Sequence, residues 1–168
     1  MLKEFDINEF KFNPFELIGK EWMLIACGDQ NAHNMMTASW GGLGVLWEKN
    51  VATVYIRPTR YTYEFVQKKD YFSLNFFGGN KAPHKIGGSK SGRDIDKAKA
   101  AGLTPVFDCD TVYYKEAELV IICKKLYCGQ ILKENFLDDN IDKFYPLKDY
   151  HKIFIGEIVK SLKIPQRI

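Results

Sequence analysis

Two short segments carry residue types that could bind a phosphorylated ligand. The first, residues 57–62 (RPTRYT), places two guanidiniums and two hydroxyls where a β-branched stretch ends and a helical stretch begins. Free N–H groups at the start of a helix carry partial positive charge, and arginine forms bidentate bonds to phosphate. The segment lacks the glycine loop of nucleoside-triphosphate sites, so it predicts a ligand with a single phosphate group. The alternative is an ordinary capped helix with solvated arginines.

The second segment, residues 34–42, is uncharged and contains small and hydroxyl-bearing side chains. Small side chains at Ala38 and Ser39 would let a planar ring approach the backbone closely, and Thr37 and Ser39 add hydroxyl donors. Backbone N–H and C=O groups could then bond the edge of a heteroaromatic ring. The alternative is an ordinary strand with a bulge at its two final glycines.

Strands must position both segments, because the periodicity of the chain is mostly that of β-structure. Apolar runs rich in β-branched and aromatic residues predict strands at residues 22–27, 51–56, 71–77, 119–123, 126–132 and 152–159. Helices are predicted at residues 61–69, with Thr62 as the cap, at 83–86 and at 94–101. The absence of βαβ alternation favours a mainly β fold, an antiparallel barrel with a few short helices packed outside.

Composition narrows the class of protein. A length of 168 residues predicts one domain, residues 1–168, and the net charge of only +3 argues against a general nucleic-acid binder. The longest aliphatic run, residues 119–122, is far shorter than the ~20 residues of a membrane helix, and the first residues contain no apolar leader segment. We therefore expect a cytoplasmic protein with no nucleic-acid and no membrane partner.

Cysteine and histidine spacing does not predict a metal site. The four cysteines form no CxxC pair and are expected to be reduced core thiols. His33 and His84 have no spaced carboxylate or cysteine partner, so metal ligation is not expected. His151 precedes the last predicted strand and is expected to be solvated. The alternative for His151 is a contact with a bound ligand.

Five segments, taken in order, resemble the FMN-binding split-barrel family of flavin reductase-like proteins, and in particular its flavoredoxin-type branch. They are residues 34–40 (NMMTASW), 57–62 (RPTRYT), 72–77 (FSLNFF), 91–97 (SGRDIDK) and 154–158 (FIGEI). The resemblance covers the core of the domain, about residues 15–160. It implies a Greek-key antiparallel split barrel, usually a homodimer, with FMN near the subunit interface.

The resemblance also implies a set of FMN contacts, with no catalytic side chain and no metal. The isoalloxazine ring would be lined from residues 34–40 by Thr37, Ala38, Ser39 and Trp40, and Asn34 and Met36 of the same segment are further cofactor contacts. The resemblance also implies the alternative role of His151, a contact with a flavin or nicotinamide. The ribityl chain and phosphate would be held by Arg57, Thr59, Arg60, Tyr61 and Thr62. The next strand end would border the flavin through Asn75, Phe76 and Phe77. Ser91 and Gly92 are looser candidates, the alternative being a capped helix start with Asp94 in its first turn.

Bound FMN would carry the chemistry, while the protein supplies position, polarity and exclusion of water. The resemblance implies an oxidoreductase that passes hydride or electrons from a reduced donor, such as NADH or NADPH, through FMN to an acceptor. The other function left open is a flavoredoxin-type electron-transfer flavoprotein that serves an electron-carrier protein and has no nicotinamide site of its own. A haem-binding or pyridoxamine-phosphate-oxidase-like relative of the barrel ranks last, since it would need more basic residues around the phosphate.

Two surface features bear on partners. The acidic residues Glu134, Asp138, Asp139 and Asp142 are expected to form a solvated loop face, the alternative being a surface for a protein partner. Aromatic residues make up 14% of the chain. Their apolar surface is more than a barrel of this size is expected to bury alone. An isologous homodimer is the expected solution.

Overall fold

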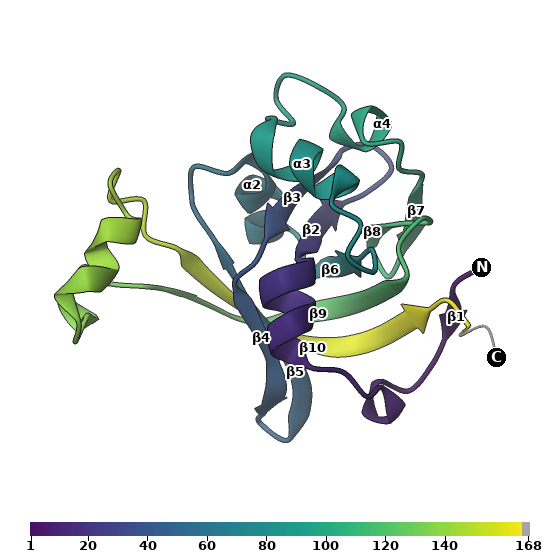
Figure 1. Cartoon of the computed structure of the whole chain (residues 1–168), viewed down its shortest axis with the longest axis horizontal. Coiled ribbons are helices and arrows are strands. Elements are labelled where there is room, and N and C mark those ends of the chain that lie inside the picture. Colours follow the sequence, from purple (N-terminus) through teal and green to yellow (C-terminus); the bar gives the residue numbers. More distant parts are fainter. Residues whose placement is uncertain (166–168) are drawn as a thin grey trace.

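A curled antiparallel sheet of eight strands dominates the computed structural model, which describes residues 1–165 (Figure 1). Its order is β3-β2-β6-β9-β10-β5-β4, and β1 pairs with β10 outside this path. A separate hairpin is formed by β7 and β8. The strands are β1 (Lys3–Glu4), β2 (Met23–Gly28), β3 (His33–Ala38), β4 (Gly41–Leu46), β5 (Lys49–Ile56), β6 (Tyr71–Phe76), β7 (Pro105–Asp108), β8 (Thr111–Tyr114), β9 (Leu119–Gln130) and β10 (Lys152–Lys163).

The helices are short and lie outside the sheet. Helix α2 packs on β2 and β3, and α3 and α4 also cover β3 (Figure 1). The helical elements are η1 (Ile7–Glu9), α1 (Pro14–Glu16), η2 (Leu17–Glu21), α2 (Tyr61–Lys68), α3 (Ala82–Ser89), α4 (Lys97–Ala100), η3 (Lys133–Asn135) and η4 (Asp139–Phe144). The predicted fold class, mainly β with a few short helices outside, is confirmed. None of the helices within residues 1–165 has the length and apolar character needed to cross a bilayer.

The two ends of the sheet are neighbours in the sequence. Strands β3 and β4 stand at opposite ends of the strand order, yet only Ser39 and Trp40 separate them along the chain. The sheet must therefore curl until its edges meet, and the gap between these edges is the split of the barrel. Each edge strand pairs on one side only, so β3 keeps a free row of backbone N–H and C=O groups.

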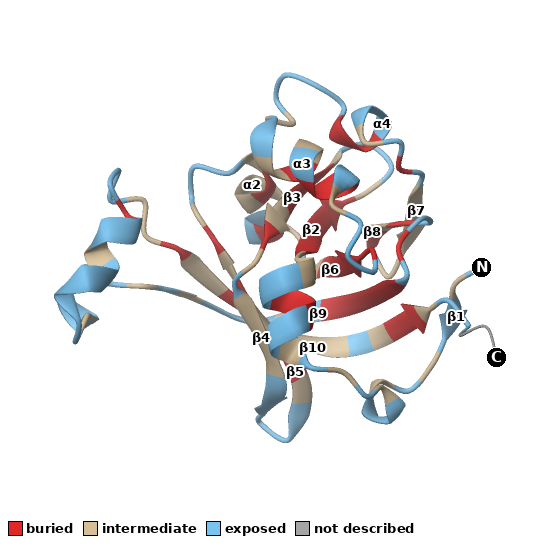
Figure 2. Ribbon diagram, in the orientation of Figure 1, coloured by how far each residue is buried: buried red, intermediate tan, exposed pale blue. Residues whose placement is uncertain are grey.

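The uninterrupted apolar run of β2 follows from burial of both its faces. Met23, Ile25 and Cys27 point into the barrel core, while Leu24 and Ala26 belong to a second cluster between the sheet and the β7–β8 hairpin. Figure 2 shows the resulting red band across β2, β6 and the first half of β9. Strands buried on both sides lack polar alternation, as this one does.

Strand β10 crosses close to β9 at a glycine. A Cβ atom at Gly156 would lie 2.7 Å from the Cβ of Cys123 and 2.8 Å from the ring of Phe72. The register with β9 shifts between Ile155 and Gly156, so a bulge bends the strand at the same point. On the inner face of β10, Phe154 is fully buried.

Beyond β9 and β10 the chain forms a projecting arm, residues 131–151, which carries η3 and η4 (Figure 1). Figure 2 shows most of the arm exposed, and Leu137 and Leu147 are among its exposed apolar residues. Glu134, Asp138 and Asp139 are exposed, as predicted for a solvated face. Asp142 is half-buried and accepts hydrogen bonds from Lys148 and Tyr150, so it orders the arm instead.

Several predicted elements need correction. Residues 119–123 and 126–132 are not two strands but belong largely to the single strand β9. Thr62 is not a cap, because α2 starts at Tyr61 with Arg60 in the cap position. The helix predicted at residues 94–101 begins only at Lys97, capped by Asp96. The second segment is not one strand with a bulge at its glycines, because β3 ends at Ala38 and Gly41 and Gly42 begin β4. Strands β7 and β8 are not among the predicted elements.

The cysteines divide by environment. Cys27 and Cys123 are buried core thiols as predicted, and burial raises the pKa of Cys27 to about 12. Cys109 is half-buried at the β7–β8 turn, and Cys128 is exposed on β9. The expectation of core thiols is therefore wrong for Cys128.

Candidate functional site

Two adjoining pockets lie beside β3. The split pocket, of about 210 Å³, opens where the barrel edges meet and is lined by Met36, Thr37, Ala38, Ser39, Trp40, Tyr55, Arg57, Arg60 and His151. The basic pocket, of about 190 Å³, lies at the start of α2 and is lined by Asn34, Met36, Thr59, Arg60, Tyr61, Thr62, Ser89, Lys90, Ser91, Gly92, Arg93 and Lys97. Met36 and Arg60 line both pockets, so the structure brings the two predicted segments together.

The split pocket is built on the free edge of β3. Ala38 is buried and small, and Ser39 follows it where the chain leaves the strand, so a flat molecule can reach the unpaired backbone groups. Thr37 is not a free hydroxyl donor, because its Oγ1 donates to the carbonyl of His84 in α3 over 2.6 Å. No carboxylate lines this pocket, so it is neutral apart from its two arginines.

Arg57 has a partner that the sequence did not reveal. Its guanidinium donates to Asp149 Oδ1 and to the carbonyl of Phe144, each over 2.7 Å, and lies over the ring of Tyr145. All three partners belong to the arm. Thr59 donates to the second oxygen of Asp149 over 3.2 Å. The charge of Arg57 thus joins the end of β5 to the arm, and its phosphate contact stays a prediction.

The basic pocket holds positive charge without balancing carboxylates. Arg60 donates to the carbonyl of Gly88 over 3.2 Å, and Lys97, only 5% exposed, donates to the carbonyl of Gly87 over 2.7 Å. Within residues 1–165 neither of these cations, nor Lys90, forms a salt bridge. Such a cavity suits an anion with several oxygens.

Lys97 was not among the predicted contacts. Burial lowers the pKa of its ammonium to about 8, and the neighbouring charge of Arg60 adds to the effect. A buried cation of this kind is stabilised when an anion binds beside it. Its signal in the sequence was weak, because Lys97 is one of 24 basic residues and its burial depends on helix α3.

Asn34 and Gly92 form the back of the basic pocket. Asn34 donates from Nδ2 to Thr62 Oγ1 over 2.9 Å, which joins β3 to α2. A side chain at Gly92 would overlap Asn34 Oδ1, so the loop can press against β3 only because residue 92 is glycine. Ser91 also reaches this pocket, whereas Arg93 pairs with Glu64 and lies over the Tyr61 ring.

The structure does not bring Asn75, Phe76 and Phe77 to either pocket. Strand β6 is separated from β3 by β2, and all three side chains are buried. Asn75 donates to the carbonyl of Leu24 over 3.3 Å and accepts from the backbone N–H of Tyr114 over 2.9 Å. It therefore joins β6 to β2 and β8.

His151 is buried, so the expectation of a solvated histidine is wrong. It is 7% exposed, its Nδ1 lies 2.7 Å from the hydroxyl of Tyr145, and its ring centre lies 5.3 Å from that of Trp40. Burial lowers its pKa to about 4, with a further contribution from Arg57, so the imidazole is neutral at pH 7. A neutral imidazole beside the split pocket can donate or accept one hydrogen bond from its other nitrogen.

An apolar pocket adjoins the split pocket on the side of the N-terminal helices. Its volume is about 390 Å³, and it shares Ser39, Trp40, Tyr55 and His151 with the split pocket. The remaining lining residues are Pro14, Phe15, Ile18, Gly19, Gly41 and Ile131, none of them charged. A second uncharged ring could lie there against a ring held in the split pocket.

These pockets fit a phosphorylated flavin. The basic pocket offers Arg60, Lys97 and the hydroxyl of Thr62 to a phosphate, and the adjoining split pocket offers backbone and Ser39 groups to a ring edge. The residues from 1 to 165 include no group of three His, Cys, Asp or Glu side chains that could hold a metal ion.

Comparison with known proteins agrees with this fit. A family model described as a flavin reductase like domain matches residues 16–163 of the chain. No curated protein matches the sequence.

Three solved structures illustrate the shared fold. An FMN-binding domain of a flavin reductase-like enzyme from Shewanella baltica is 17% identical, with a TM-score of 0.69, and the match covers 97% of this chain and 77% of that one. Flavoredoxin of Desulfovibrio vulgaris is 24% identical, with a TM-score of 0.66, and the match covers 88% and 70%. An NADH:FAD oxidoreductase from Streptomyces globisporus, in complex with NAD and FAD fragments, is 13% identical, with a TM-score of 0.64 and coverage of 89% and 78%. At these identities the likeness establishes the fold.

Proposed function

The chain belongs to the flavin reductase like domain family, and from this we propose that it is an FMN-binding oxidoreductase. It takes hydride or electrons from a reduced donor such as NADH or NADPH and delivers them to an acceptor. The observation that carries the proposal is the adjacency of the basic and split pockets, which share Met36 and Arg60. Together they match a molecule with a dianionic phosphate at one end and a neutral ring at the other.

Each residue of the site has a defined task in this proposal. Arg60 and Lys97 neutralise the phosphate, and Thr62 donates its hydroxyl hydrogen to it. The free edge of β3 bonds the polar rim of the ring, with Ser39 adding a hydroxyl. His151 closes the split pocket from the arm side and holds one neutral hydrogen-bonding nitrogen near the ring. FMN, when bound, supplies the hydride and electron chemistry.

The visible spectrum of the purified protein tests flavin binding. A yellow preparation, or apoprotein that takes up added FMN with quenching of its fluorescence, supports the proposal. A colourless preparation that takes up no FMN overturns it. Arg60→Met serves as the matched variant, since it removes the one cation that lines both pockets and should weaken uptake.

The donor is tested separately by mixing the holoprotein with NADH or NADPH without air. The apolar pocket supports a nicotinamide donor, because an uncharged ring fits beside the split pocket there. The structurally similar Streptomyces globisporus protein is an NADH:FAD oxidoreductase. Rapid bleaching of the flavin supports a reductase.

A flavoredoxin-type electron carrier is the second candidate, and the arm favours it. Exposed acidic residues and the exposed Leu137 lie on the same projection, and Phe144 of the arm lies against Trp40 of the split pocket, with ring centres 5.7 Å apart. A protein partner docked on the arm would thus lie close to the flavin. No bleaching by NADH or NADPH, with reduction only by a reduced carrier protein, supports this candidate.

We also propose a homodimer. Exposed apolar side chains gather at the β4–β5 turn and on the nearby outer part of β9, including Val45, Trp47 and Tyr127, with the Trp47 and Tyr127 ring centres 6.4 Å apart. Apolar surface of this kind is usually covered by a partner. Light scattering should report about twice the chain mass of 19.4 kDa, and a monomer mass would contradict the proposal. Cytoplasmic location stays a prediction from the sequence.

A further inference from the structure

Tyr145 of the arm is hydrogen-bonded to the histidine that lines the split pocket. Its hydroxyl oxygen lies 2.7 Å from Nδ1 of His151, and the two residues are only 3% and 7% exposed. Their ring centres lie 5.4 Å apart in an edge-to-face arrangement. The FMN site proposed above gives Tyr145 no task.

Both partners are neutral at pH 7, so one hydrogen lies between them. Burial lowers the pKa of His151 to about 4, and burial raises the pKa of Tyr145, so the hydroxyl keeps its hydrogen. Either the O–H donates to an unprotonated Nδ1, or an Nδ1–H donates to the hydroxyl oxygen. The first arrangement leaves an N–H on Nε2 of the imidazole, and the second leaves a lone pair there.

The surroundings of Tyr145 decide between the two arrangements. The guanidinium of Arg57 lies 4.8 Å from the centre of its ring, and the rings of Phe136 and Tyr150 also pack against it. Within residues 1–165, Nδ1 of His151 is the one acceptor that lies within hydrogen-bond distance of the Tyr145 hydroxyl. If Nδ1 carried the hydrogen, the buried O–H would have no acceptor, which is costly. The first arrangement is therefore the more stable.

The other nitrogen of His151 is the one that a ligand can reach. His151 lines both the split pocket and the apolar pocket. Its Nε2 has no hydrogen-bond partner within residues 1–165 and, unlike both ring nitrogens of His84, is not fully buried. No carboxylate among the residues that line the two pockets competes for a hydrogen on Nε2.

We propose that Tyr145 is a positioning residue, whose hydroxyl holds His151 in the Nε2–H tautomer so that the split pocket presents a hydrogen-bond donor to its ligand. The inference rests on the proposed flavin function. It adds the kind of atom that the ligand places beside His151, which is an acceptor such as a carbonyl oxygen or an unprotonated ring nitrogen. The arm thus acts on the ligand through Tyr145.

Nitrogen NMR of the flavin-free protein at pH 7 tests the tautomer, because protonated and unprotonated ring nitrogens have well-separated ¹⁵N chemical shifts. The chain has three histidines, and a His151→Phe variant assigns the signals of His151. We expect a protonated Nε2 and an unprotonated Nδ1 in the wild type. Tyr145→Phe should contain a mixture of both tautomers. This variant should fold, because its ring keeps the contacts with Arg57 and Phe136.

Tyr150→Phe is the matched control on the arm. The Tyr150 ring centre lies 4.9 Å from that of Tyr145, and its hydroxyl donates to Asp142 over 2.8 Å. Tyr150 lines neither the split pocket nor the apolar pocket. The control should therefore keep the wild-type tautomer of His151.

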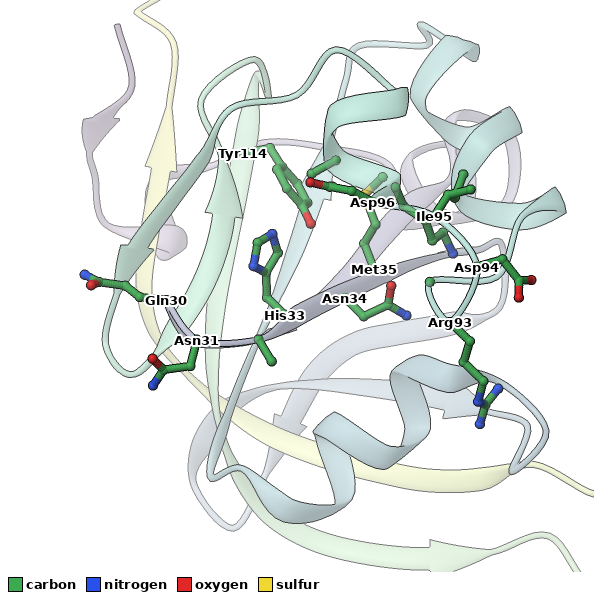
Figure 3. Close-up of a pocket in the computed structure, with 14 residues that line it drawn as sticks. Gln30, Asn31, His33, Asn34, Met35, Arg93, Asp94, Ile95, Asp96 and Tyr114 are labelled. Atoms are coloured by element: carbon green, nitrogen blue, oxygen red, sulfur yellow. The ribbon is translucent and has the colours of Figure 1, made fainter.

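The other two histidines serve as internal references. His33 is half-exposed at the start of β3, where Figure 3 shows its ring on the wall of another pocket. His84 is buried in α3. Their signals should be the same in the wild type and in Tyr145→Phe. If all three histidines changed, the variant would have lost structure, and the tautomer of the wild type would decide alone.

FMN titration gives the second measurement. In Tyr145→Phe only the Nε2–H fraction of His151 can donate, so the FMN affinity should fall by the inverse of that fraction. A variant with equal amounts of both tautomers should bind FMN about twofold more weakly. A purely structural loss gives no reason for the affinity to follow the fraction that NMR measures.

The outcomes separate this inference from the function on which it rests. An Nδ1–H tautomer in the wild type, or a Tyr145→Phe protein that keeps Nε2–H alone, overturns the role of Tyr145 and leaves the flavin function standing. An unchanged FMN affinity despite mixed tautomers overturns the action of the donor on the ligand. If the protein binds no FMN, the proposed function fails, while the flavin-free spectra still decide the tautomer.

Discussion

Arg57 and Asp149 form an ion pair with 2.7 Å between Nη1 and Oδ1, although they lie 92 positions apart in the chain. Their side chains are 22% and 10% exposed, so solvent screens the pair only in part. The pair joins the end of β5 to the base of the arm, and Thr59 binds the same carboxylate. The arm is therefore held against the split pocket by the Arg57 guanidinium, the same group that the sequence suggested as a phosphate ligand.

Asp149→Asn should lower the free energy of unfolding by about 2 kcal/mol, because it leaves the half-buried Arg57 without its counter-charge. Urea denaturation of the variant measures the loss. Glu16→Gln is the control, since it breaks the Glu16–Lys20 pair, whose side chains are 53% and 75% exposed. Solvent screens that exposed pair, so the change should have little effect on the free energy of unfolding. Equal losses in the two variants would refute the role given to Asp149.

Lys97→Met should weaken FMN binding by about ten- to a hundredfold, since a charge-assisted hydrogen bond contributes about 1.5–3 kcal/mol. Riboflavin lacks the phosphate, so its affinity should stay the same. Fluorescence titration with both flavins makes the comparison. Lys85→Met, on an exposed position of α3 outside the pockets, should alter neither affinity. A parallel loss of riboflavin binding would place Lys97 near the ring instead.

FMN affinity should fall as the pH rises above about 8. The pKa of Lys97 is lowered to about 8 in the flavin-free protein, so above that pH the ammonium must regain a proton before it can bind phosphate. The loss should approach tenfold per pH unit, and the Lys97→Met protein should lack this dependence. Titrations between pH 7 and 9.5 measure both slopes. Identical slopes in the two proteins would contradict the assignment.

Acid should destabilise the fold through two buried histidines. His84 is 2% exposed, neither ring nitrogen has a partner within residues 1–165, and burial lowers its pKa to about 4; the pKa of His151 is also about 4. Between pH 6.5 and 4 the unfolded chain binds more protons than the folded one, so stability falls as pH falls, by about 1.4 kcal/mol per unit for each histidine.

His84→Leu should therefore roughly halve this acid slope while His151 retains its share. The free energy of unfolding, measured by denaturant at steps between pH 7.5 and 4.5, gives the slope for each protein. If the variant kept the same slope, His84 would bind its proton equally well in the folded and the unfolded chain, and burial would not lower its pKa.

Gly92→Ala should reduce flavin affinity and stability together, because the added Cβ would overlap Asn34 Oδ1 and push the loop off β3. Gly88→Ala is the matched glycine control, since its added Cβ would lie 3.6 Å from the nearest atom, Thr37 Cβ. Thermal unfolding and FMN titration of the two variants should separate them clearly. If Gly92→Ala changed neither the unfolding temperature nor the FMN affinity, the loop would have room to shift.

Local patterns were sufficient for the strands whose own residues favour β-structure. The β-branched and aromatic runs of β5 and β6 and the apolar run of β2 were predicted close to their observed bounds. Strand β4 (GGLGVL) contains three glycines and β7 starts at a proline, so both have low intrinsic strand preference and depend on their partners. The separation of β9 into two strands failed because the exposed Lys124 breaks the apolar pattern without breaking the ladder.

The candidate site was predictable only where its residues are close in the sequence. Residues 36–40 and 59–62 lie in the pockets because each is a continuous segment at the end of a strand. The partner of Arg57, the burial of His151 under the arm, and the burial of Lys97 beneath α3 each depend on packing between distant segments. Asn75 is the opposite case. Its position at a strand end suggested a ligand contact, but its side-chain amide forms hydrogen bonds with the backbones of β2 and β8.

Among residues 1–165, β10 is the strand furthest along the chain, and it lies between β9 and β5, which are joined in the sheet only through it. Until residues 152–163 have left the ribosome, β5 and β4 have no route into the sheet, and His151 has no strand to hold it. The split pocket, which Tyr55, Arg57 and His151 line, is therefore completed only after β10 has joined the sheet. A ligand bound there stabilises the finished barrel against unfolding.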